Sequence, residues 1–151
     1  MVARLARARA AVAAVADPEI PVLTIEDLGI LRDVRLDGDT VEVTITPTYS
    51  GCPAMNVITW EIEAALALAG FSSVRVSSVL SPAWTTAWMS EDGKRKLRAY
   101  GIAPPNPTAP PTCPQCNSAM TELISAFGST SCKALHRCLS CREPFDAFKC
   151  H

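Results

Sequence analysis

Residues 31–70, LRDVRLDGDTVEVTITPTYSGCPAMNVITWEIEAALALAG, contain two kinds of hydrophobic pattern joined by one turn. Alternating β-branched residues lie on both sides of Asp37-Gly38, and an Asp-Gly pair in that setting predicts a β-hairpin. Pro53 opens the second half, where apolar residues recur with helical spacing up to Gly70. The stretch therefore predicts two antiparallel strands followed by a helix.

The predicted helix carries an apolar stripe. The stripe consists of Val57, Trp60, Ala64, Ala67 and Leu68. Pro53 suits the first helical position, because its fixed φ angle fits a helix and its missing N–H is not needed there. Gly70 stands where a glycine commonly follows the end of a helix. We expect this stripe to be the face that packs against the sheet.

Three further segments complete the first domain. Residues 2–16 predict a helix that ends before Asp17-Pro18, because proline and the residue before it do not easily continue a helix. Residues 72–80 predict a third strand, and residues 90–101 predict a short helix with Ser90 as its N-cap. The order helix–strand–strand–helix–strand–helix indicates an α+β domain, in which the third strand lies beside the hairpin and helices pack on a short mixed sheet.

The composition changes at the proline-rich segment GIAPPNPTAPPTC, residues 101–113. Such a segment favours a stiff, extended spacer. One cysteine precedes it, and the other six come at or after its end. We therefore expect an α/β domain over residues 1–101, a linker over 102–112 and a zinc-ribbon-like domain over 113–151.

The overall composition excludes several classes of protein. A net charge of −1 and a pI of about 6.1 argue against nucleic-acid binding. No apolar run approaches the roughly 20 residues that span a bilayer. The Arg- and Ala-rich N-terminus lacks the serine enrichment of a transit peptide. With no secretory signal, the seven cysteines favour a reducing compartment, so we expect a cytoplasmic protein with no nucleic-acid or membrane partner.

A single cysteine, Cys52, lies between Gly51 and Pro53 at the predicted junction of strand and helix. Its sulfur would face unpaired backbone N–H groups and the positive end of the helix dipole, which lower a thiol pKa. A thiolate is the form that ligates metal or attacks an electrophile. The alternative is an inert buried cysteine, since free cysteine is among the most buried residue types. Cys–His hydrolysis is disfavoured, because His136 and His151 both lie in the tail.

The turn DPEIP, residues 17–21, is a second candidate. Asp17 and Glu19 flank a proline in a rigid turn and could orient a partner or help to hold a metal near Cys52. Ordinary turn chemistry is the simpler alternative, with Asp17 capping a neighbouring N–H and Glu19 solvated.

The tail contains two Cys-x-x-Cys pairs separated by 21 residues. The pairs are Cys113 with Cys116 and Cys138 with Cys141. Each two-residue gap lets one tight turn present two sulfurs to one ion, and two such turns complete a tetrahedron. Four thiolates suit Zn²⁺ but also an iron–sulfur cluster, and structural Zn²⁺ is the main prediction. Alternative ligands are Cys132, His136 and Cys150.

Three stretches resemble the signature segments of the metal–sulfur cluster biosynthesis family, which takes part in iron–sulfur cluster maturation. They are DPEIPVLTIEDLGILRDV (17–34), TPTYSGCPAMNVI (46–58) and SPAWTTAWMSEDGKRKL (81–97). The tail, in particular GSTSCK (128–133) and CREPFDAFKC (141–150), is similar to the C-terminal extension of the PaaD family. PaaD proteins accompany the phenylacetyl-CoA epoxidase, a ring 1,2-monooxygenase, of bacterial phenylacetate degradation.

The resemblance implies that Cys52 is the family's reactive cysteine and that Asp17 and Glu19 form its acidic turn. It implies a zinc ribbon held by Cys113, Cys116, Cys138 and Cys141, with Cys132, His136 and Cys150 also part of the PaaD-like pattern. The implied function is an accessory or maturation factor without turnover of its own, which transiently binds iron or a cluster while the epoxidase's iron–sulfur or iron centre is assembled. Implied partners are the monooxygenase subunits and general iron–sulfur assembly proteins. The alternative is a non-catalytic or redox subunit of the monooxygenase complex that uses thiol chemistry.

Overall fold

In a computed structural model of the protein, which describes residues 2–48, 52–130 and 132–149, the chain divides into two compact units. The first comprises Met1–Trp84 with Trp88–Ser90, and the second comprises Thr85–Ala87 with Glu91–His151. Helix α4 (Glu91–Ala99) therefore groups with the second unit, ahead of the boundary expected at Gly101. The expected ranges 1–101, 102–112 and 113–151 stay a prediction.

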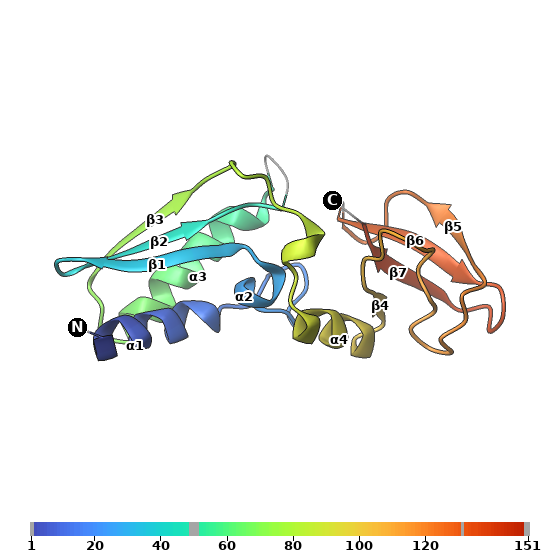
Figure 1. The fold of residues 1–151 in the computed structure, drawn as a ribbon, viewed down its shortest axis with the longest axis horizontal. Coiled ribbons are helices and arrows are strands. Elements are labelled where there is room, and N and C mark those ends of the chain that lie inside the picture. The colour runs from blue at the N-terminus through green and yellow to red at the C-terminus, as the bar shows by residue number, and fades with distance from the viewer. Residues whose placement is uncertain (1, 49–51, 131, 150–151) are drawn as a thin grey trace. The chain divides into compact units, whose positions relative to one another are not determined.

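The first unit is a mixed sheet with helices on one face (Figure 1). Its elements are α1 (Val2–Ala13), α2 (Ile25–Leu28), β1 (Leu31–Asp37), β2 (Thr40–Ile45), α3 (Ala54–Leu68) and β3 (Ser73–Ser78). The strand order is β1-β2-β3, with β1 antiparallel and β3 parallel to β2. The predicted α+β fold and the place of the third strand beside the hairpin are confirmed.

The hairpin between β1 and β2 turns where the Asp-Gly pair predicted it. Asp37 pairs with Thr40, which leaves Gly38 and Asp39 in the turn. Gly38 has a φ of +59°, a left-handed value that glycine adopts without steric cost. The turn therefore sets a register that places Val34, Val41 and Val43 in the buried layer.

Helix α3 packs with a different face from the one its apolar stripe predicted. The buried residues are Ala54, Ile58, Ile62 and Leu66. In contrast, Trp60 is 65% exposed and Leu68 is 91% exposed. Both sides of this helix are apolar, so periodicity alone does not show which side faces the sheet. The predicted stripe is thus wrong as a core face.

None of the described helices has both the length and the apolar character that a membrane span needs.

The connection from α1 to β1 contains structure that the sequence pattern did not predict. Helix α1 ends at Ala13 rather than at residue 16, and Ala16 forms a β-bridge with Thr24. Thr24 then caps the short helix α2 through a capping box with Asp27. These bonds fold residues 16–24 into a closed loop that brings the DPEIP turn back against the unit.

The second unit contains α4 and a four-stranded ribbon sheet. Its strands are β4 (Ile102–Ala103), β5 (Thr121–Ser125), β6 (Lys133–Cys138) and β7 (Pro144–Phe148), in the order β4-β7-β6-β5. A 3₁₀ turn, η1 (Thr86–Trp88), precedes α4. The proline-rich segment packs on this unit, because β4 pairs with β7 and the Thr121 hydroxyl donates to the Pro111 carbonyl at 2.7 Å.

Candidate metal centre and the Cys52 turn

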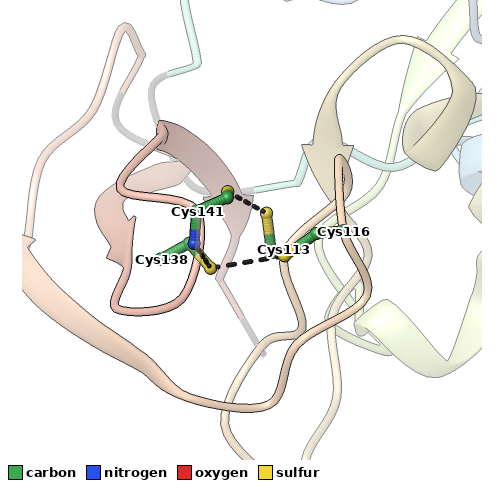
Figure 2. Close-up of side chains that lie close together, drawn as sticks. All are labelled: Cys113, Cys116, Cys138 and Cys141. Atoms are coloured by element: carbon green, nitrogen blue, oxygen red, sulfur yellow. Dashed lines mark hydrogen bonds between the residues drawn. The ribbon is translucent and has the colours of Figure 1, made fainter.

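Four cysteine side chains of the second unit converge on one point (Figure 2). Two precede β5, one ends β6 and one lies in the turn between β6 and β7. They are Cys113, Cys116, Cys138 and Cys141, whose sulfur atoms all lie within 4.8 Å of one another. The Sγ atoms of Cys113 and Cys141 are 3.7 Å apart, and those of Cys116 and Cys138 are 3.5 Å apart. The two Cys-x-x-Cys turns thus face each other.

The two turns have the same backbone design. The N–H of Gln115 points to the Cys113 sulfur and the N–H of Cys141 to the Cys138 sulfur, each at 3.4 Å. Each turn is completed by a residue with positive φ, Asn117 at +64° and Arg142 at +71°, whose N–H donates back to the first cysteine's carbonyl oxygen. Each loop therefore directs a backbone N–H at the sulfur of its first cysteine.

These contacts separate the pKa values of two sulfurs. Hydrogen bonds from the backbone of Cys141 and Ser140 lower the pKa of the Cys138 thiol to about 6, against the opposing effect of burial. For Cys141, a backbone hydrogen bond from Glu143 acts to lower the pKa, but burial and the neighbouring thiols raise it to about 12. Of these two thiols, Cys138 therefore loses its proton at the lower pH.

The sulfur geometry fits a single tetrahedral ion. A Zn–S bond of about 2.3 Å in tetrahedral coordination places sulfurs about 3.8 Å apart. The two close sulfur pairs, at 3.5 and 3.7 Å, are near this spacing. Four sulfur donors suit Zn²⁺ and also iron, so the arrangement can bind metal and does not by itself choose between them.

The alternative ligands lie outside this cluster or outside the described residues. Cys132 is buried, with its sulfur 2.9 Å from the Thr130 hydroxyl. His136 stacks on Phe145, and burial lowers its pKa. Neither belongs to the group of converging sulfurs among the described residues. Cys150 lies outside the described residues.

Arg98, at the end of α4, is a site residue that the sequence analysis missed. Its guanidinium donates to the Thr112 hydroxyl at 3.0 Å and to the Cys113 carbonyl at 3.2 Å, and it also binds the Asn117 side-chain oxygen. One side chain thus holds both ends of the first cysteine turn. No motif signals this contact, because the charge lies 15 residues before the cysteine whose carbonyl it binds.

Cys52 lies one residue before Pro53, the N-cap of α3, and is partly exposed. The Met55 N–H donates to the Cys52 carbonyl at 3.3 Å, so the residue is part of the turn that starts the helix. Residues 49–51, including Gly51, lie outside the described residues. Cys52 is therefore a partly exposed residue beside a helix start.

Asp17 is buried, and its hydrogen bonds stabilise the local turn. Its carboxylate accepts a hydrogen bond from the Glu19 N–H at 2.9 Å, and its own N–H donates to the Leu23 carbonyl at 2.9 Å. Glu19 is partly exposed. The described residues contain no group in which Cys52 and both acids lie close enough to share one ion.

Comparisons with known proteins cover both units. A family model described as PaaD zinc beta ribbon domain matches residues 102–149, and one described as iron-sulfur cluster assembly protein matches residues 5–78. The chain is 54% identical over 141 residues to a protein of Escherichia coli (strain K12) that is named as a putative subunit of 1,2-phenylacetyl-CoA epoxidase, covering 89% of this chain and 86% of that one.

Two further relatives match the first unit. The "Fe-S protein maturation auxiliary factor YitW" of Bacillus subtilis (strain 168) is 39% identical over 85 residues, which are 55% of this chain and 82% of that protein. A crystal structure of a DUF59 domain of unknown function from Bacillus anthracis superposes with a TM-score of 0.58 at 29% identity, covering 64% of this chain and 92% of that one.

Proposed function

This chain belongs to the PaaD family, and from that premise we propose that it is an accessory factor of a phenylacetyl-CoA epoxidase complex that helps to assemble the complex's iron–sulfur or iron centre. The identity of 54% along most of the chain to the Escherichia coli epoxidase protein supports the link to that complex. The iron-sulfur assembly model on residues 5–78 supports the maturation role. Proposed partners are the epoxidase subunits and general iron–sulfur assembly proteins, in the cytoplasm.

The four converging cysteines are the proposed ligands of a resident structural Zn²⁺. A bound zinc ion would supply a cross-link between the two Cys-x-x-Cys turns. The ribbon needs such a link because a domain of this size buries little apolar surface. One buried cluster of the ribbon consists mainly of small residues: Ala103, Cys113, Cys138, Phe145 and Ala147. In this role the ribbon is a rigid surface, and its sulfurs take no part in the transfer of iron.

Cys52 is the proposed handling residue for iron or for a cluster in transit. The observation that supports this is its position, partly exposed and next to the N-terminal turn of α3. Asp17 shapes the DPEIP turn through its bond to the Glu19 N–H, and Glu19 is the partly exposed acid of that turn.

A single substitution tests this function. Cys52→Ala, compared with the matched surface change Asn56→Ala in the first turn of α3, should leave the protein folded by circular dichroism. Epoxidase purified from cells carrying Cys52→Ala should contain less iron and be less active, while Asn56→Ala should have no effect. Normal iron content and activity of the epoxidase from cells carrying Cys52→Ala would contradict the proposal.

The alternative is a permanent subunit with a redox dithiol, and the word subunit in the relative's name favours it. The two ideas differ in stoichiometry and in thiol reactivity. An assembly factor leaves the mature complex, whereas a permanent component copurifies with it in a fixed ratio. Thiol titration of the metal-loaded complex adds a second criterion, because a redox pair stays reactive while metal-bound thiolates do not.

A further inference from the structure

Helix α3 has an outer face that is apolar and uncovered. Most residues of its sequence, AMNVITWEIEAALAL, are apolar, yet only Ala54, Ile58, Ile62 and Leu66 are buried. Trp60 and Leu68 lie on the opposite side and are 65% and 91% exposed. Large exposed apolar side chains grouped on one surface commonly mark a site of interaction with another protein. This exposed apolar surface therefore has the character of a protein–protein interface.

A groove runs along this face between α3 and the end of α1. One cavity of about 250 Å³ is lined by Ala11, Ala14, Ala64 and Leu68 among others. A second cavity of about 250 Å³ continues it toward the DPEIP turn, where Pro18, Pro21 and Val57 line it. Ala16 and Glu61 line both cavities. The floor is made of small side chains, and from Val57 to Leu68 it extends for about three helical turns.

The charge of the groove restricts what can occupy it. Helix α3 contains two acids, Glu61 and Glu63, and no basic residue. Glu61 is exposed in the middle of the groove, and within the described part of the chain it has no hydrogen-bond or ion-pair partner. A carboxylate set among apolar side chains favours a partner that brings a positive charge to it.

The same charge argues against a second copy of this chain. Two copies that paired through the middle of this groove, with the two-fold axis close to Glu61, would bring Glu61 toward its symmetry mate, because the same patch meets itself in such an interface. Like charges facing each other in an apolar contact are unfavourable. The occupant must therefore be a different surface with the opposite charge.

We propose that the groove between α1 and α3 binds an amphipathic helix of another protein, of about three turns, with aliphatic side chains on one face and a lysine or arginine that pairs with Glu61. The groove's length and its small-residue floor fit a helix laid along it, with anchors at i, i+3 or i+4 and i+7. Leu68 lines one end of the groove as a large, exposed apolar contact. The binding surface does not depend on Cys52 or on metal.

Site-specific photo-crosslinking of the full-length chain in its native host tests the proposal. Leu68→p-benzoylphenylalanine places the probe at the end of the groove, and Leu80→p-benzoylphenylalanine is the matched control at an exposed leucine that lines neither cavity. Mass spectrometry of the product identifies the crosslinked peptide. The expected result is a helical peptide of another protein, with aliphatic spacing and a basic residue, at position 68 and not at position 80.

Charge reversal completes the test. Glu61→Lys in the Leu68 probe background should reduce the crosslink about fivefold or more, while Cys52→Ala should leave it unchanged, which separates this inference from the proposed function. An unchanged yield with Glu61→Lys would overturn the proposal. So would equal yields at positions 68 and 80, or crosslinks confined to a second copy or to the chain's own second unit.

Discussion

At the scale of single residues, the candidate metal centre includes the guanidinium of Arg98 in addition to the four cysteine sulfurs. It holds the hydroxyl before Cys113, the carbonyl of Cys113 and the side chain of Asn117. Residues that hold the backbone around metal ligands help to fix the ligand geometry and so contribute to metal affinity. The residue therefore couples α4 to the first cysteine turn.

Replacing Arg98 by Ala should weaken metal binding. Outer residues of this kind change metal affinity by about 10-fold or more. Arg95→Ala is the control, because Arg95 lies on the same helix and pairs with Asp92 on the exposed side. Competition of each variant with a chromophoric chelator measures the affinity, and equal affinities for the two variants would refute the role given to Arg98.

Alanine substitutions at Gly29 and Gly38 separate two contributions to the free energy of unfolding: the cost of backbone strain and the cost of a packing clash. Both have positive φ, at +80° and +59°, so alanine at either position costs about 1 kcal/mol. A Cβ at Gly29 would lie 2.6 Å from the Trp88 Cβ and 2.8 Å from the Trp88 carbonyl, whereas nothing lies within 4 Å at Gly38. Gly29→Ala should therefore cost about 1–3 kcal/mol more than Gly38→Ala in urea unfolding. Equal losses would show that Trp88 does not pack there.

At the scale of elements, α3 shows where sequence patterns stop being informative. The stripe at Val57, Trp60 and Leu68 is regular, but the structure buries the branched residues on the other side. The hairpin, the helix and the third strand were predictable because local turn chemistry and spacing determine them. The buried face of α3 and the bond from Arg98 were not, because both depend on contacts between segments far apart in sequence.

The two faces of α3 should respond differently to truncation. Ile62→Ala removes a fully buried side chain and should lower the free energy of unfolding of the first unit by about 2–5 kcal/mol. Leu68→Ala removes an exposed one and should change it by no more than about 0.5 kcal/mol. Chemical denaturation followed by circular dichroism gives both values, and a large loss for Leu68→Ala would mean that this face is covered in the isolated chain.

At the scale of the whole molecule, the two units use sulfur in different ways. The second unit gathers four sulfurs into one cluster, while the first leaves one thiol beside the start of a helix. The Cys-x-x-Cys spacing predicted that the four would meet, and it could not predict that α4 and the proline-rich segment belong to the same unit. In the proposed function, the first unit handles iron or a cluster in transit, and a bound metal stabilises the second unit.

Chelation should unfold the second unit alone, since a small core depends on its metal. Hydrogen exchange should show loss of protection in β5, β6 and β7, and also in α4, because α4 groups with that unit. Helix α3 should stay protected. Protection retained in α4 would instead place the boundary at Gly101, and loss in α3 as well would show that the two units unfold together.

The central claim is that four cysteines hold one resident zinc ion while Cys52 remains a free, reactive thiol. Metal and sulfide analysis together with counting of fast-reacting thiols tests it most directly, on the wild type and on Cys52→Ala. We predict one zinc and no sulfide per chain in both proteins, and one fewer fast-reacting thiol in the variant. Iron and sulfide bound by the four cysteines, or a count of fast-reacting thiols that Cys52→Ala leaves unchanged, would contradict the account.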